Sequence, residues 1–106
     1  MYTRAFLVAT AASVVAISAL AAELVTVSQK GLRFSETDIT IAKGQVVAFM
    51  NDDRATHNIT VDGEGISVNG GLQPPGTEFR MPFAKPGTYL VSCGIHPKMK
   101  LTVTVK

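Results

Sequence analysis

The sequence has no second cysteine. Its 106 residues include one cysteine, Cys93, so no disulfide can form within the chain. It also has no large excess of charge of one sign, because ten Lys and Arg residues face eight Asp and Glu residues. That balance gives no electrostatic reason to expect nucleic-acid binding. After residue 22, no segment shows the period of an amphipathic helix.

Long apolar runs are confined to the first 22 residues. Arg4 precedes an alanine-rich stretch that ends in Ala19-Leu20-Ala21, a small-x-small cleavage pattern. We therefore expect residues 1–21 to be a signal peptide that is cleaved near Ala21 and Ala22. A retained membrane anchor is the alternative, because the run approaches the roughly 20 residues that span a bilayer. Its many Ala, Ser and Thr residues make it a weak span. No cysteine lies at the junction, which argues against a lipid anchor.

The remaining chain, residues 22–106, is short enough to be one domain. Removing Arg4 with the signal peptide leaves a net charge near +1. A domain of this size buries a modest share of its surface and gains stability from a bound metal or another cross-link. An unpaired thiol in an oxidising compartment is a liability unless something occupies it.

Short segments of alternating polarity, separated by Gly, Pro, Asn and Asp, predict β-strands. The expected strands are Leu24–Gln29, Asp38–Ala42, Gln45–Met50, His57–Asp62, Thr77–Ala84, Thr88–Ser92 and Leu101–Lys106. Gln45–Met50 is more continuously apolar than the others, as in a strand that is buried on both faces. Residues 62–76 are expected to be mostly loop, because they contain Gly70-Gly71 and Pro74-Pro75. The pattern predicts an all-β fold, a single Greek-key antiparallel β-sandwich.

Alternation along two of these strands directs two chemically reactive side chains to the core. His57 shares its face with Ile59 and Val61, and Cys93 shares its face with Val91. Both residues lie at strand ends and extend apolar rows. We expect them to meet at the edge of the core, where water is scarce.

The residues around Cys93 predict a metal site. Taken singly, a buried cysteine, a histidine or a methionine has an ordinary structural explanation. Here, however, the only cysteine and both histidines combine with a methionine, as His57 and the sequence Cys93-x-x-His96-x-x-Met99. A thiolate, two imidazoles and a weak thioether are the ligands of a type 1 copper site. Zinc is the alternative ion, but a thioether is a poor zinc ligand.

Three motifs resemble the cupredoxins, the small blue-copper family of plastocyanins, pseudoazurins and amicyanins. They are the pair His57-Asn58, the approach Gly87–Cys93 with its tyrosine, and Cys93-x-x-His96-Pro97-x-Met99, which is similar to the ligand loop of amicyanins. The resemblance covers nearly all of residues 22–106. One departure is that amicyanin-like loops usually carry Thr-Pro where this chain has Gly94-Ile95.

The resemblance implies a role for each residue. His57, Cys93 and His96 would be the equatorial copper ligands, and Met99 the axial one. The N–H of Asn58 would point at the thiolate sulfur, while its side chain would tie the His57 strand to the Cys93 loop.

His96 would be the port through which electrons enter and leave. Candidates for its apolar surroundings are Ile95, Leu72, Pro74 and Pro97, and Lys98 and Lys100 flank it.

The expected function is a periplasmic shuttle of single electrons, not an enzyme. It would be a monomer that is not bound to a membrane in its mature form. It would carry electrons between redox proteins, such as a dehydrogenase donor and a c-type cytochrome acceptor. A periplasmic copper carrier with the same ligands is the main alternative. An enzyme that uses Cys93 and His96 as nucleophile and base is a third possibility, but no third residue that orients the base is evident in the sequence.

Overall fold

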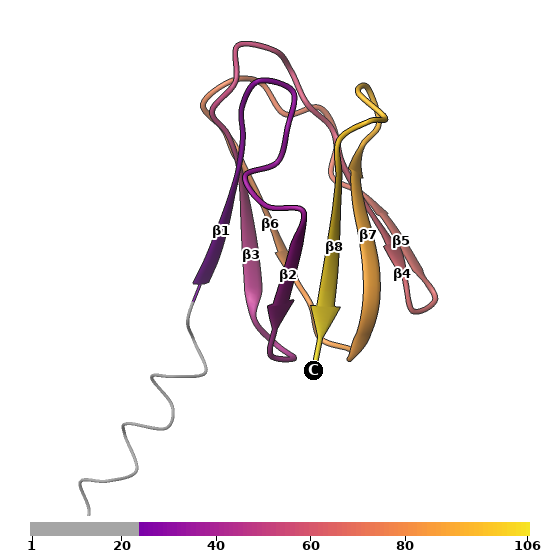
Figure 1. Cartoon of the computed structure of the whole chain (residues 1–106). Helices are drawn as coiled ribbons and strands as arrows, with labels where there is room; N and C mark the ends of the chain where they lie inside the picture. Colours follow the sequence, from indigo (N-terminus) through magenta and orange to yellow (C-terminus); the bar gives the residue numbers. More distant parts are fainter. Residues whose placement is uncertain (1–23) are drawn as a thin grey trace, which may run out of the picture.

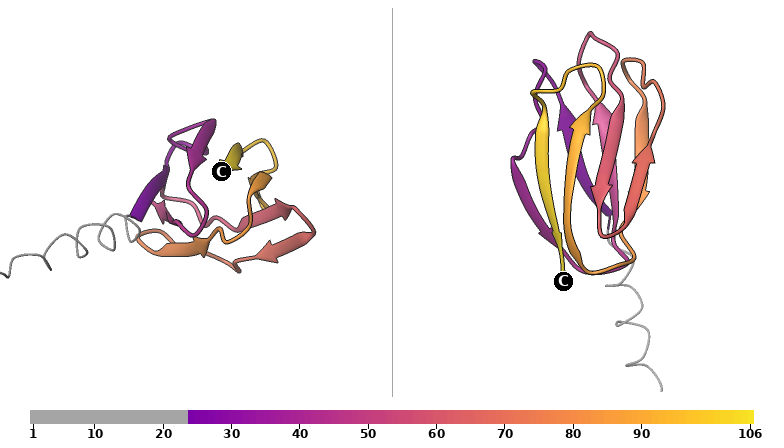
Figure 2. Two further views of the ribbon diagram at one scale, coloured as in Figure 1. Left: turned by 90° about the horizontal axis from the view of Figure 1, so that it is seen from below. Right: turned by 90° about the vertical axis from the view of Figure 1, so that its right-hand side faces the viewer.

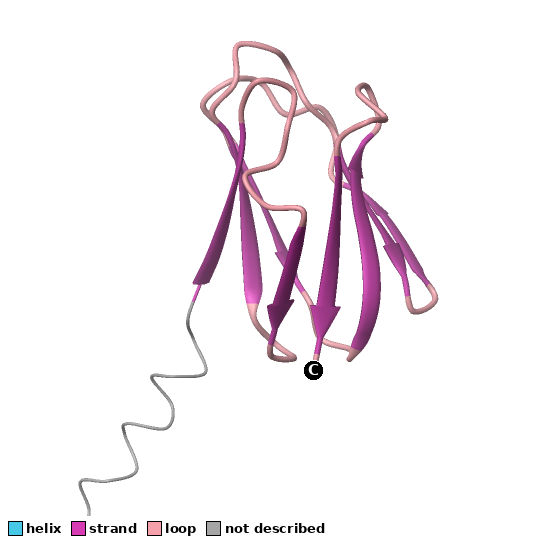
Figure 3. Cartoon of the chain, in the orientation of Figure 1, coloured by secondary structure: helices cyan, strands magenta, loops and turns pink. Residues whose placement is uncertain are grey.

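The computed structural model describes residues 24–106, so the predicted signal peptide lies outside the described residues. The described part of the chain forms eight strands. Figure 3 shows these strands joined by loops, with no helix among the described residues. Among these residues there is accordingly no helix that could cross a bilayer. The strands are β1 (Leu24–Gln29), β2 (Asp38–Ile41), β3 (Val46–Asn51), β4 (Ile59–Gly63), β5 (Ile66–Asn69), β6 (Glu78–Pro82), β7 (Gly87–Cys93) and β8 (Lys100–Val105) (Figure 1).

The strands form two sheets, and the strands of both run roughly along one axis (Figure 2). One sheet has the order β1-β3-β6 and the other the order β2-β8-β7-β4-β5. The chain changes sheet at most of its connections, so the predicted Greek-key β-sandwich is confirmed. It is not wholly antiparallel, however, because β1 is parallel to β3 and β2 is parallel to β8. The members of these two pairs are not joined by hairpin turns, which leaves their relative direction free.

The core lies between the two sheets. Three successive residues of β3, Val47, Ala48 and Phe49, are buried, because β3 is the central strand of its sheet. This confirms the predicted burial of both faces of that strand. The strands β1, β4, β7 and β8 bury alternate residues, as expected for strands with one face toward the core. The buried cluster includes Val27, Phe49, Ile59, Val61, Val91, Leu101 and Val103.

One strand was not expected. Residues 62–76 are mostly loop, as predicted, but they include β5, which forms a hairpin with β4 in which Gly63 pairs with Ile66. Both turn residues have positive φ, 49° at Glu64 and 82° at Gly65, as a type I′ turn requires. The strand β5 does alternate, with Ile66 and Val68 on one face and Ser67 and Asn69 on the other, but it has only four residues and is mostly exposed.

The end of the sandwich opposite the C-terminus gathers the predicted ligands. The loop that follows β3 and the loop between β7 and β8 both lie at this end (Figure 1). Ile59 of β4 pairs with Cys93, the last residue of β7. This register brings His57, two residues before Ile59, beside the end of β7.

Candidate metal centre

His57 enters the core just before β4 and is fully buried. Its backbone forms an isolated antiparallel bridge with Gln73, in which the His57 N–H donates at 3.0 Å and the carbonyl accepts at 2.7 Å. Buried amides extend this anchor, because Asn51 Nδ2 donates to the Gln73 carbonyl and Gln29 Nε2 donates to Gln73 Oε1. These hydrogen bonds hold the backbone of His57 in place.

Cys93 is the buried last residue of β7, 1% exposed. The N–H of Asn58 donates to Cys93 Sγ at 3.3 Å, as predicted. The side chain of Asn58 does not make the predicted link to the Cys93 loop. Its Nδ2 donates instead to Asn69 Oδ1 and to the Gly71 carbonyl, both at 2.8 Å. Gly94 has no side chain with which to bond, and the link to this loop runs through the backbone, from the Gly94 N–H to the Asn58 carbonyl at 2.8 Å.

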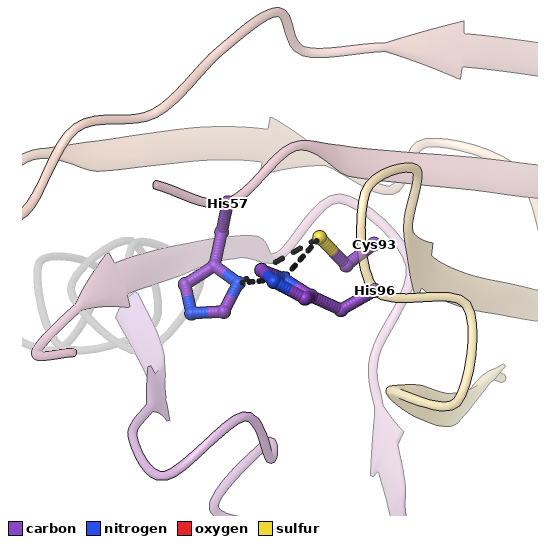
Figure 4. Close-up of side chains that lie close together, drawn as sticks. All are labelled: His57, Cys93 and His96. Atoms are coloured by element: carbon purple, nitrogen blue, oxygen red, sulfur yellow. Dashed lines mark hydrogen bonds between the residues drawn. The ribbon is translucent and has the colours of Figure 1, made fainter. Parts of the chain in front are cut away.

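Three of the predicted ligands converge (Figure 4). His57 Nδ1 lies 3.6 Å from Cys93 Sγ, His96 Nδ1 lies 3.7 Å from the same sulfur, and the two Nδ1 atoms are 3.2 Å apart. First-row metal bonds of about 2.0 Å to nitrogen and about 2.3 Å to sulfur place ligand atoms about 3.2 to 3.8 Å apart. The three donor atoms therefore fit one metal ion.

Met99, the predicted axial ligand, ends the same loop and is 2% exposed. Its N–H donates to the His96 carbonyl at 3.0 Å, which closes the turn between the two residues. A soft thioether donor is thus buried at the end of the loop that carries His96, where it is available as an axial ligand.

His96 is only partly buried, and it borders an open hollow of about 380 Å³. Ile95 and Pro97 line this hollow, as predicted, whereas Leu72 and Pro74 do not. A further lining residue, which was not expected from the sequence, comes from the loop after β1. This lining residue is Leu32, which has a φ of 59° and is 49% exposed. The mostly apolar rim gives His96 a surface that another protein can cover.

Asp53 is the residue at this centre that sequence reasoning missed. Its Oδ2 lies 3.0 Å from His57 Nε2, the ring nitrogen that does not face Cys93. The N–H of Leu32 and then the hydrogen bond to His57 hold the pKa of Asp53 well below its usual range. The expectation that no third residue orients the base concerned His96, whereas Asp53 bonds to the other histidine, His57.

Asp53, His57 and Cys93 lie in the order of a hydrolase triad. However, the Cys93 thiol is 1% exposed and the His57 ring is fully buried. A nucleophile must reach the reacting carbon of its substrate, and this sulfur has no open approach. The arrangement suits a metal ligand better than a nucleophile.

The β-sandwich and the two imidazoles around a buried thiolate define a class, the copper proteins with a type 1 centre. The chain belongs to the plastocyanin/azurin family of copper-binding proteins, whose family model matches residues 21–106. The predicted cupredoxin family and the predicted copper cofactor are thus confirmed.

Known proteins similar to this chain fall in the same group. The chloroplastic plastocyanin of Silene latifolia subsp. alba is 33% identical over 98 residues, which cover 81% of this chain and 59% of that protein. The chain thus spans less than two thirds of that relative's length. A reduced amicyanin variant has a TM-score of 0.73 at 20% identity, with 78% of this chain and 82% of that one covered, and shows the same fold. A purple cupredoxin from Nitrosopumilus maritimus has a TM-score of 0.68 at 26% identity, with 77% and 99% covered.

Proposed function

We propose that this protein carries single electrons by cycling one bound copper ion between Cu(I) and Cu(II). The proposed ligands are His57, Cys93 and His96, with Met99 in the axial position. The observation that carries the proposal is that three donor atoms from two separate segments lie 3.2 to 3.7 Å apart at the edge of the core. A site held by the protein in this way rearranges little when the ion changes oxidation state, which favours fast electron transfer.

The proposed ligands would have different roles in an electron carrier. Bound copper supplies the redox centre, while the buried His57 and Cys93 keep water and reactive molecules from it. His96 reaches the hollow that Leu32 and Ile95 help to line. Partners would dock over His96, which offers the shortest path between the ion and the surface.

The location and the partners are part of the same proposal. We propose export to the periplasm after removal of residues 1–21, followed by action as a monomer. The alanine-rich start of the chain and the lone thiol, occupied by a metal in an oxidising compartment, support this. The proposed donor is a redox enzyme such as a dehydrogenase, and the proposed acceptor is a c-type cytochrome.

The test uses residues 22–106 loaded with Cu(II). We expect an intense visible band from thiolate-to-copper charge transfer, which Cys93→Ser abolishes. The reduced protein should then pass its electron to an oxidised c-type cytochrome in a stopped-flow assay. A colourless Cu(II) form, or the same band in Cys93→Ser, would exclude the ligand set. A blue protein that exchanges no electrons with any redox partner would exclude the carrier role.

A copper carrier that delivers its metal is the second candidate function. Such a protein needs exposed, exchangeable ligands, whereas His57, Cys93 and Met99 are at most 2% exposed. Incubation of the copper-loaded protein with a mild chelator separates the two functions. An electron carrier should keep its copper for hours, and loss of the ion within seconds would favour delivery.

A further inference from the structure

We propose that Asp53 is a positioning residue of the metal centre, which holds His57 in the tautomer that binds metal through Nδ1 and favours Cu(II) over Cu(I). The contact between Asp53 and His57 carries this inference. The inference about Asp53 depends on a copper centre at these ligands, but it does not depend on the proposed role as an electron carrier.

The contact selects one tautomer of the ring. An ionised carboxylate only accepts hydrogen bonds, so the ring nitrogen 3.0 Å from Asp53 Oδ2 must carry the proton. In a neutral imidazole the other nitrogen, Nδ1, then has a free lone pair. That Nδ1 is the atom of His57 that faces Cys93 Sγ and His96 Nδ1. Asp53 thus orients the ring and prepares its donor atom before a metal arrives.

The Asp53 carboxylate is itself held in place. Its Oδ2 also accepts the N–H of Leu32, and its Oδ1 accepts the N–H of Arg54, both at 2.9 Å. The Asp53 N–H donates in turn to Asn51 Oδ1 at 2.9 Å. Since Asn51 is fully buried, the turn that aims Asp53 at His57 is anchored in the core. An aspartate that met His57 only by chance would lack these supports.

The charge of Asp53 acts on the ion through the ring. Its side chain is 14% exposed, so solvent screens it only in part. Among residues 24–106 it has no Lys or Arg partner within ion-pair distance. A carboxylate bonded to the distal nitrogen makes a ligating imidazole more basic. A more basic ligand stabilises the more highly charged ion, so Asp53 should lower the reduction potential.

The chain offers a matched control at the adjacent position. Asp52 is an acidic residue like Asp53, but its Oδ2 accepts the Ser28 hydroxyl at 2.6 Å and it makes no contact with His57. Asp52→Asn and Asp53→Asn remove the same charge from neighbouring positions. Only Asp53→Asn removes it from a group bonded to a ligand.

The experiment compares both variants with wild type, all as residues 22–106. We expect Asp53→Asn to weaken Cu(II) binding tenfold to a hundredfold. Its Cu(I) affinity should fall about tenfold less, which corresponds to a rise of about 59 mV in the one-electron reduction potential. Asp52→Asn should change each affinity less than about twofold, and Asp53→Glu should restore part of the lost Cu(II) affinity. Equal shifts in the two asparagine variants, or none in Asp53→Asn, would overturn the proposal.

A second measurement uses only the metal-free wild-type protein, so it does not depend on copper binding or on whether a variant folds. Nitrogen-15 NMR of metal-free wild type at alkaline pH should show His57 protonated at Nε2. A ring protonated mainly at Nδ1 would overturn the proposed role of Asp53 even if the variants behave as expected. If no copper binds to wild type, the copper centre fails, and this NMR result still tests Asp53 separately.

Discussion

Replacing Gly94 with alanine should destabilise the fold through Asn58. Gly94 does not have a positive φ, so its backbone accepts alanine, but an added Cβ would lie 2.5 Å from Asn58 Oδ1. Asn58 must therefore move, which strains its two hydrogen bonds to Asn69 and Gly71. Their combined loss costs about 1 to 3 kcal/mol. The lower entropy of unfolded alanine returns about 0.4 to 1 kcal/mol, so we expect a net loss of about 1 to 2 kcal/mol.

Urea unfolding of the metal-free protein, residues 22–106, measures this loss without a contribution from copper. The control is the same substitution in an Asn58→Ala background, where the obstructing oxygen is gone. There, Gly94→Ala should be neutral or should stabilise the fold by about 0.4 to 1 kcal/mol. An equal loss of stability in both backgrounds would refute the proposed contact between Gly94 and Asn58 as the cause.

Three further predictions concern the core, the docking surface and pH. Leu101→Ala, at a fully buried site, should cost about 2 to 5 kcal/mol of unfolding free energy, whereas Leu90→Ala, at a site 42% exposed, should cost about 0.5 kcal/mol or less; similar losses would contradict the assigned faces of β7 and β8. Lys98 lines the His96 hollow, and Lys98 and Lys100 both line the hollow next to it. Lys98→Glu combined with Lys100→Glu should slow association with an acidic redox partner in stopped-flow assays, and wild-type rates should fall with added salt; rates insensitive to both changes would exclude docking through these lysines. Because the pKa of Asp53 is held below its usual range, its ionised form stabilises the fold above the unfolded pKa of about 3.9, and that stabilisation is lost as the pH falls further. The free energy of unfolding in urea, measured between about pH 2 and 6, should therefore decrease more steeply with falling pH for wild type than for Asp53→Asn. Parallel curves for the two proteins would contradict this.

Local polarity was enough to predict most of the strands. The range Leu24–Gln29 was predicted exactly as the structure has it, and Leu101–Lys106 differs from β8 by one residue at each end. The alternation of apolar and polar residues involves residues that are neighbours in the chain, so it can be recognised from the sequence. The strand β5 escaped prediction because its alternation spans only four residues and because its turn uses Glu64 in a positive φ. The parallel pairing of β1 with β3 depends on contacts between distant segments, which local patterns do not encode.

The predicted ligands could be chosen from the sequence because the candidates are so few. The chain has two histidines and one cysteine, and the spacing from Cys93 through His96 to Met99 is short enough for one loop to present all three. Strand parity placed His57 and Cys93 on core-facing rows, and both are buried. Residue chemistry and local spacing therefore determined which side chains form the candidate centre.

Part of the surroundings of those ligands was decided by the tertiary structure. Asp53 precedes His57 by four residues in a loop, where that spacing implies no fixed geometry; the buried amide of Asn51 sets the turn that brings them together. Leu32 reaches the hollow beside His96 from a loop more than sixty residues away along the chain, while Leu72 lies outside it. The physical reason is the same in both cases. A ligand's identity is a property of its own side chain, whereas its hydrogen-bond partner and its exposure depend on which segments the folded chain packs against it.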